Sequence, residues 1–244
     1  MKRLGLLVLV CVATPAYAGK HPRFEPTDLE LEDPGTTELD LQFGPALNSD
    51  GWRVLTPDFE ADFGVLPNLE LDLDGAYAFD GNANVVDNLW PSVKVGLGDW
   101  RDDTTKRAWA LGLQAGPKLP IAPDNHGVGF EAIALFGYMV GRVHLVFDLG
   151  GLIDPHDASA PRPKGFEAGV DLELVLVPDK WSLLGELGGV RYVSDDAHQL
   201  ATTAGVQYSP NDHVDLSLVA LTGFADGSDK FALLAGVSLH LGLF

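Results

Sequence analysis

Carboxylates alternate with apolar residues along two neighbouring stretches of this chain. Residues 58–74 read DFEADFGVLPNLELDLD, with acidic side chains at every second position on both sides of a Pro-Asn pair. Side chains two apart point to the same face of a β-strand. A row of fixed carboxylates beside a water-filled passage attracts cations and repels anions. The candidate acidic wall consists of Glu38, Asp40, Asp58, Glu60, Asp62, Glu70, Asp72 and Asp74.

The turn at Pro67-Asn68 determines how these carboxylates oppose one another. A symmetric turn would pair Asp62 with Glu70, Glu60 with Asp72 and Asp58 with Asp74. Like charges directly opposite destabilise a sheet by up to ~1 kcal/mol a pair, so we expect water, bound cations, raised pKa values or basic side chains to compensate. The candidate basic partners are Lys94, Lys118, Arg142 and Arg191. They are too few, because further inward acids are expected at Glu167, Asp171, Glu173 and Asp215.

Alternating segments of this kind recur along nearly the whole chain. Such ~10-residue segments, separated by turn residues, are the sequence signature of a transmembrane β-barrel. The pattern predicts an all-β, antiparallel up-and-down transmembrane barrel of about 12 strands over residues 37–244. The predicted strands are 37–47, 57–65, 69–79, 89–99, 106–119, 128–140, 142–153, 165–177, 181–193, 199–208, 213–225 and 230–243.

The connections between these strands differ in length in a regular way. Outer-membrane barrels have short periplasmic turns and longer outer loops. The predicted short connections are 65–68, 141, 178–180 and 209–212, and only 100–105 is less regular. The predicted long ones are 48–56, 80–88, 120–127 and 154–164. We therefore expect the first strand to rise from the periplasm.

Alternation alone does not say which face is inside, and a soluble barrel with an apolar lumen is the alternative. Aromatic residues near the strand ends favour lipid on the outside. Trp109 and Trp181 begin strands in phase with the apolar set, and Tyr138, Tyr208 and Phe224 end strands in phase with it. Aromatic girdles of membrane barrels have this placement.

Residues 1–18 have the pattern of a secretory signal peptide, which we expect to be cleaved after Ala18. Lys2 and Arg3 precede an apolar run over residues 4–13, and Ala16-Tyr17-Ala18 is a cleavage pattern. A membrane anchor is the alternative, but the run is far shorter than the ~20 residues that span a bilayer. Residues 19–36, with Pro22, Pro26 and Pro34, are predicted to be an extended periplasmic segment.

The composition limits the classes of partner that this protein is expected to bind. The chain has 35 acidic and 16 basic residues, which argues against nucleic-acid partners. The only cysteine, Cys11, lies in the predicted leader. We expect outer-membrane lipid around the barrel, a small solute or cation in the lumen, and no cofactor.

Metal sites and nucleophiles are weakly indicated. Asp72-Leu73-Asp74-Gly75 lacks the distant glutamate of a calcium loop. The oxygen-rich loops at 154–157, 195–196 and 226–229 could bind calcium weakly. Ser238 and His240 share one strand face, and a symmetric hairpin would place Asp215 opposite His240 and Ser217 opposite Ser238. A Ser-His-Asp hydrolase needs the histidine bonded to the serine, and two side chains along one strand suit this poorly.

Two resemblances extend these predictions. A strand ending in Phe244 resembles the signal by which outer-membrane proteins reach their assembly machinery, although Leu239, Leu241 and Leu243 are out of phase with that aromatic. Segments 37–44, 57–64 and 112–120 resemble outer-membrane β-barrel porins associated with phenol meta-pathway operons. This resemblance implies a twelve-stranded barrel of transporter type, without catalytic residues.

The first functional hypothesis is a porin-like channel or passive transporter for small solutes, favouring cations or unselective. The alternative is a structural or interaction barrel whose lumen is blocked by side chains or by the N-terminal segment and whose outer loops bind a partner. A barrel hydrolase ranks third.

Overall fold

The computed structural model describes residues 31–49, 51–79, 84–86, 88–121, 125–157, 162–193 and 198–243. The predicted leader, most of the predicted extended segment, the Asp195-Asp196 loop and Phe244 lie outside these ranges. Within them, no helix is long and apolar enough to span a bilayer.

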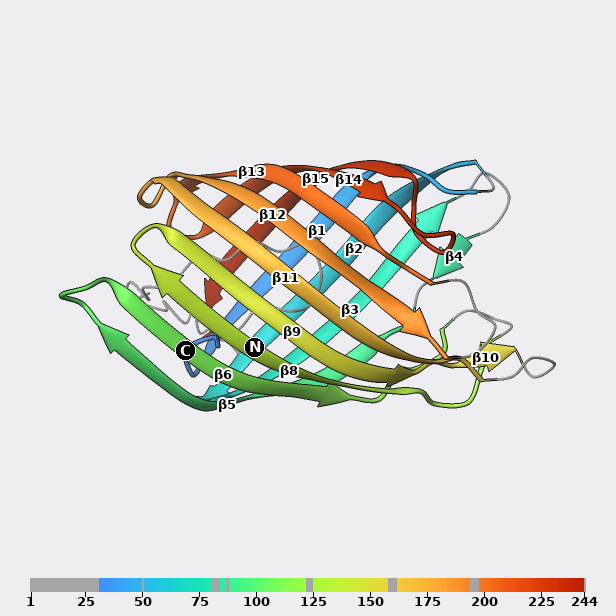
Figure 1. Ribbon diagram of the computed structural model, residues 1–244, viewed down its shortest axis with the longest axis horizontal. Coiled ribbons are helices and arrows are strands. Elements are labelled where there is room, and N and C mark those ends of the chain that lie inside the picture. The colour runs from blue at the N-terminus through green and yellow to red at the C-terminus, as the bar shows by residue number, and fades with distance from the viewer. Residues whose placement is uncertain are drawn as a thin grey trace, which may run out of the picture.

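In the described part of the chain, twelve long antiparallel strands form a closed up-and-down barrel, and they run obliquely across it (Figure 1). Neighbouring strands in the sequence pair with one another, and the sheet closes because β1 pairs with β15. The long strands are β1 (Thr36–Leu47), β2 (Trp52–Leu66), β3 (Leu69–Phe79), β5 (Trp90–Asp102), β6 (Arg107–Gly116), β8 (Phe130–Val140), β9 (Val143–Ile153), β11 (Lys164–Val177), β12 (Trp181–Tyr192), β13 (Ala201–Asn211), β14 (Val214–Gly223) and β15 (Phe231–Gly242). The fold predicted from the alternation is confirmed.

Three short strands lie within segments that we expected to be loops. They are β4 (Asn84–Val86), β7 (Asn125–His126) and β10 (His156–Asp157). β4 extends the pairing of β3, whereas β7 and β10 form a separate two-stranded sheet. In Figure 1, β4 and β10 lie at the same end of the barrel. We call this the loop end, and the opposite end, with the short connections 67–68, 103–106, 141–142, 178–180 and 212–213, the turn end.

Several predicted strand ends differ from the observed ones by two or more residues, and the differences at β2 and β5 change the connections most. β2 begins at Trp52 instead of residue 57, because the register shift between Leu55 and Asp58 accommodates Pro57, which has no N–H for the ladder. The first of the predicted long connections therefore shrinks to residues 48–51, where the Asn48 side chain accepts a hydrogen bond from the Gly51 N–H at 3.0 Å. β5 continues to Asp102, so the connection that looked irregular is a four-residue turn.

The predicted pairing of β2 with β3 was wrong by two residues. Asp62 lies opposite Asp72, and Glu60 lies opposite Asp74. The cause is a turn of only two residues, with Leu66 paired to Leu69, followed by a register irregularity at Val65. A shift of two keeps every side chain on its predicted face, so the acidic residues still share one side of the sheet.

Burial in this barrel is the reverse of that in a water-soluble protein. Most of the fully buried side chains are polar or charged, and large apolar side chains cover the exterior of every long strand. Exposed aromatic residues gather near both ends. At the turn end Trp100 pairs with Trp109, and the Trp181 and Tyr208 rings lie 4.6 Å apart. At the loop end, Leu47 lies between exposed Trp52 and Phe231.

Candidate functional site

The interior near the turn end is filled by a layer of polar side chains, which we call the turn-end layer: Glu70, Asp72, Ser92, Lys94 and Gln114. Lys94 lies between Glu70 and Gln114 in the strand register, and Ser92 lies beside Asp72. The Lys94 Nζ is 2.7 Å from Glu70 Oε1, and both side chains are 1% exposed. Ser92 Oγ and Gln114 Nε2 donate to Asp72 Oδ2 at 3.0 and 2.9 Å. The layer thus combines a buried ion pair, Lys94 with Glu70, and a hydrogen-bonded group of Asp72, Ser92 and Gln114.

The structure places the predicted acidic wall inside the barrel, in two rows that follow the strand register. One row joins Glu38, Asp62 and Asp72, which are all buried. The other joins Asp40, Glu60 and Asp74. Asp58 lies opposite Ala76 and, with Asp74, lines the cavity described below.

Of the four predicted basic partners, only Lys94 binds the acidic wall. Lys118 instead contacts Glu131 at 2.6 Å and Asp154 at 3.0 Å. Burial disfavours its charged form, but these two carboxylates outweigh that cost and raise the pKa of Lys118 above its usual value. Arg142 and Arg191 were predicted wrongly, because both side chains are exposed. Arg142 Nη1 donates to the Leu176 carbonyl at the turn end, at 3.0 Å.

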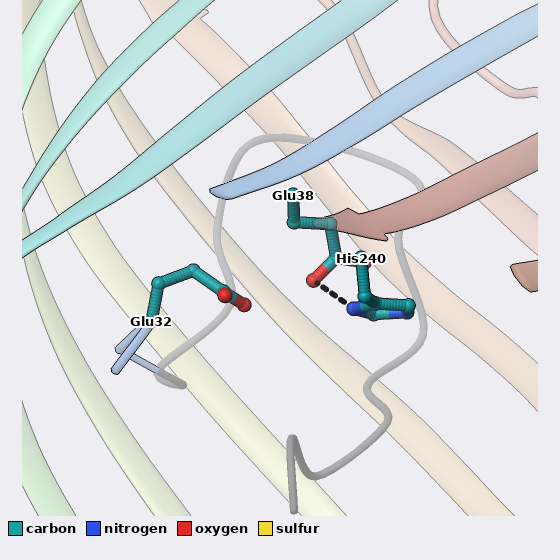
Figure 2. Close-up of side chains that lie close together, drawn as sticks. All are labelled: Glu32, Glu38 and His240. Carbon is teal, nitrogen blue, oxygen red and sulfur yellow. Dashed lines mark ion pairs between the residues drawn. The ribbon is translucent and has the colours of Figure 1, made fainter. Parts of the chain in front are cut away.

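His240 lies in the interior between two carboxylates. Its Nε2 is 2.9 Å from Asp215 Oδ2, and its Nδ1 is 3.1 Å from Glu38 Oε2 (Figure 2). The side chains of the predicted lumen pair, Asp215 and His240, thus contact each other. The predicted strand register was wrong by two residues, because Asp215 lies opposite Ser238 and Ser217 lies opposite Gly236. Ser238 Oγ donates to Asp40, and the histidine contacts carboxylates on both sides. This is not the arrangement of a Ser-His-Asp triad.

The loop half of the interior holds a cavity of about 410 Å³, which we call the vestibule. Small inward residues, among them Ala76, Gly169 and Gly188, make room for it. Its carboxylates are Asp58, Asp74, Asp148, Glu167 and Glu186, with Glu131, Asp154 and Asp229 near the loop end. Both basic side chains that line it form ion pairs. Lys118 binds Glu131 and Asp154, and Arg53 binds Asp229 at 2.8 Å. The vestibule is therefore strongly acidic.

Two of the three loops considered for calcium use their carboxylates in other contacts. Asp154 binds Lys118, and it accepts a hydrogen bond from the Tyr192 hydroxyl at 2.9 Å. Asp229 binds Arg53. Asp195-Asp196, the third, lies outside the described residues.

Residues 31–35 enter the turn end of the barrel. The alternative of a lumen blocked by the N-terminal segment includes such an entry, but the residues that hold the segment were not predicted. The Gly35 N–H donates to the Gly64 carbonyl at 2.9 Å, and the Glu32 N–H donates to Glu70. A side chain at Gly64 would collide with the Glu32 and Asp33 carbonyls, and one at Gly96 would meet Leu31. The signal in the sequence is the pair of inward glycines on β2 and β5, which leave space that a larger residue would fill.

Comparisons with known proteins bear on the fold. No family model matches this chain, and no curated protein matches it in sequence. Among solved structures, it is similar to an outer-membrane channel from Pseudomonas putida F1, with a TM-score of 0.58 and 11% identity over 90% of this chain and 100% of the other. It is also similar to the NanC porin, with a TM-score of 0.60 and 11% identity over 83% of this chain and 100% of the other. At this identity the likeness concerns the barrel fold.

Proposed function

We propose that this protein is a porin-like channel of the bacterial outer membrane, which passes small solutes and favours cations. The observation that carries the proposal is the reversed burial: an apolar exterior surrounds an interior of charged side chains and a polar cavity. In water such an exterior would be a severe aggregation liability. In lipid it is the expected surface of a barrel, because each backbone polar group is paired within the closed sheet.

The two ends of the barrel support a membrane setting. Exposed aromatic residues near the turn end and near the loop end match the girdles that lie at the two membrane interfaces. The turn end, where β1 begins and β15 ends, would face the periplasm. The similarity in fold to an outer-membrane channel and to a porin agrees with this placement. A relationship to the barrels of phenol meta-pathway operons remains part of the proposal.

Cation preference follows from the charge of the vestibule. Its two bases are already bound to carboxylates near the loop end, so Asp58, Asp74, Asp148, Glu167 and Glu186 leave a negative excess. A negative field in a narrow passage with low-dielectric walls concentrates cations. Small, positively charged solutes are therefore the proposed cargo.

The test is single-channel recording in a planar bilayer under a potassium chloride gradient. We expect discrete conductance steps, with a reversal potential on the potassium side. An anion-selective pore would refute the cation preference. A properly folded barrel without conductance would refute the channel.

The turn-end layer specifically favours a second function. Glu70 and Lys94 are each 1% exposed, and Gln114 is fully buried, so this layer holds side chains where a wide porin holds water. A barrel closed there would serve as a structural or interaction protein, with a partner bound by its outer loops. Folded protein that shows no conductance, and that binds a partner only when its outer loops are intact, would favour the interaction function over the channel.

A further inference from the structure

Three potential metal ligands converge at the turn end: Glu32, Glu38 and His240. One ligand atom from each lies within 4.8 Å of the other two, and all three side chains are buried. Figure 2 shows the Glu32 carboxylate directed toward the Glu38–His240 pair from the opposite side. Glu38 comes from β1 and His240 from β15, whereas Glu32 belongs to the segment that enters the barrel before β1.

We propose that these three side chains bind a divalent transition-metal ion such as Zn²⁺, and that the ion fastens the N-terminal segment inside the barrel. The donor set is one imidazole nitrogen and two carboxylate oxygens. Zn²⁺ accepts both donor types, and three protein ligands leave one position for water. Ca²⁺ and Mg²⁺ prefer oxygen donors alone, so the imidazole argues for a transition metal.

Asp215 supplies a further element of such a site. It lies 2.9 Å from His240 Nε2, on the side of the ring away from Glu38. In metal sites, the ligating histidine almost always donates its other ring N–H to a carboxylate, carbonyl or water, which fixes the tautomer. With the proton on Nε2, the lone pair of Nδ1 points toward Glu38 Oε2, 3.1 Å away. Asp215 thereby orients His240 for ligation.

Glu32 is held in place without help from the ion. Its Oε2 accepts a hydrogen bond from Thr36 Oγ1 at 2.7 Å, and its backbone N–H donates to Glu70. The space at Gly64 admits the backbone of residues 32 and 33. An ion bound by Glu32 would therefore join this segment to β1 and β15, the two strands that close the barrel. The proposal does not depend on conduction.

Charge favours a cation at this position. Glu32, Glu38 and Asp215 are buried close to the His240 imidazole. Buried carboxylates are costly unless they are paired or coordinate a cation. A second proton on His240 is the competing way to supply positive charge, and it needs no metal. The experiment must therefore separate a bound ion from an imidazolium between two carboxylates.

The experiment is calorimetric titration of Zn²⁺ into the tag-free mature barrel, folded in detergent. We expect one equivalent to bind, and Co²⁺ to give the visible absorption of a mixed nitrogen and oxygen site. His240→Asn and Glu32→Gln should each weaken Zn²⁺ binding at least about tenfold. Asp215→Asn should weaken it by about 10- to 100-fold, the usual range for a group that orients a ligand.

The matched control is His156→Ala, which removes a histidine of β10 at the opposite end of the barrel. It should bind Zn²⁺ as the unchanged protein does. Glu32 lies outside the strands, so Glu32→Gln keeps the test valid if His240→Asn fails to fold. The proposal is overturned if folded protein binds no stoichiometric Zn²⁺, or if Glu32→Gln binds it with unchanged affinity. Because the readout is binding in detergent, a non-conducting barrel would not affect it.

Discussion

The turn-end layer and the vestibule are built on the same twelve strands, yet they differ in how charge is compensated. In the layer, Lys94 and Glu70 face each other in register and exclude water. In the vestibule, small residues replace large ones, and the bases are bound near the loop end. Strand alternation thus decides which side chains point inward, whereas side-chain size and base position decide whether the interior is closed or open.

The largest effect is expected when one partner of the buried ion pair in the turn-end layer is removed. Glu70→Gln leaves the Lys94 ammonium buried without its carboxylate, and breaking a buried pair in this way costs about 3–5 kcal/mol. We expect a loss of that size in the free energy of unfolding, measured by urea titration in detergent. The double variant Glu70→Gln/Lys94→Met should recover most of it. A loss below about 1 kcal/mol would show that water reaches the pair.

The second prediction concerns the segment that lies over Gly64. Gly64→Val places a side chain against the carbonyls of Glu32 and Asp33 and should displace residues 31–35. A cysteine introduced at Glu32 would then react with a water-soluble maleimide about tenfold faster, because local opening governs access to a buried thiol. Gly98→Val is the control, since a Cβ at Gly98 has no neighbour within 4 Å. Equal labelling rates in the two variants would contradict the seating of this segment.

The third prediction concerns the carboxylates of the vestibule and their effect on ion selectivity. Asp148→Asn, Glu167→Gln and Glu186→Gln together remove three vestibule carboxylates without touching the turn-end layer. The ratio of potassium to chloride permeability should fall severalfold, and the reversal potential should move toward zero. Exposed Asp99, Asp103 and Asp179 supply the control triple variant, each changed to Asn. Selectivity that drops equally in both would mean that the vestibule does not line the conducting path.

The smallest effect is expected at the loop-end ion pair. Arg53→Gln breaks the contact with Asp229. The Arg53 side chain is 25% exposed and the Asp229 side chain is 13% exposed. Partly solvated pairs contribute about 1 kcal/mol or less, so the unfolding free energy should change by no more than that. A loss comparable to that of Glu70→Gln would erase the proposed difference between the two regions.

The sequence predicted the strands and their faces well, because both follow from local alternation. It failed on register at β2 and β3, where the irregularities at Val65 and Pro57 decide which carboxylates oppose one another. It also assigned Lys118 to the acidic wall, although Glu131 and Asp154 bind it. Those contacts join segments far apart in the chain, and alternation within one strand carries no information about them. The position of residues 31–35 depends on Gly64 and Gly96, which leave space for this segment inside the barrel. That role becomes visible only once the strands are arranged in three dimensions.

The pairing of β1 with β15 has a consequence for how this molecule forms. Asp40 lies opposite Ser238, so the contact that closes the barrel joins residues from the two extremes of the folded chain. Every other pairing between the long strands joins neighbours in the sequence, and such local hairpins form quickly. Contacts between distant segments must first overcome loop-closure entropy, so they form slowly. Until β15 has been synthesised and has docked, β1 remains an unpaired edge that other chains can join. Closure of the ring is therefore the slow pairing, and protection of the β1 and β15 edges until they meet is the condition for reaching the native barrel.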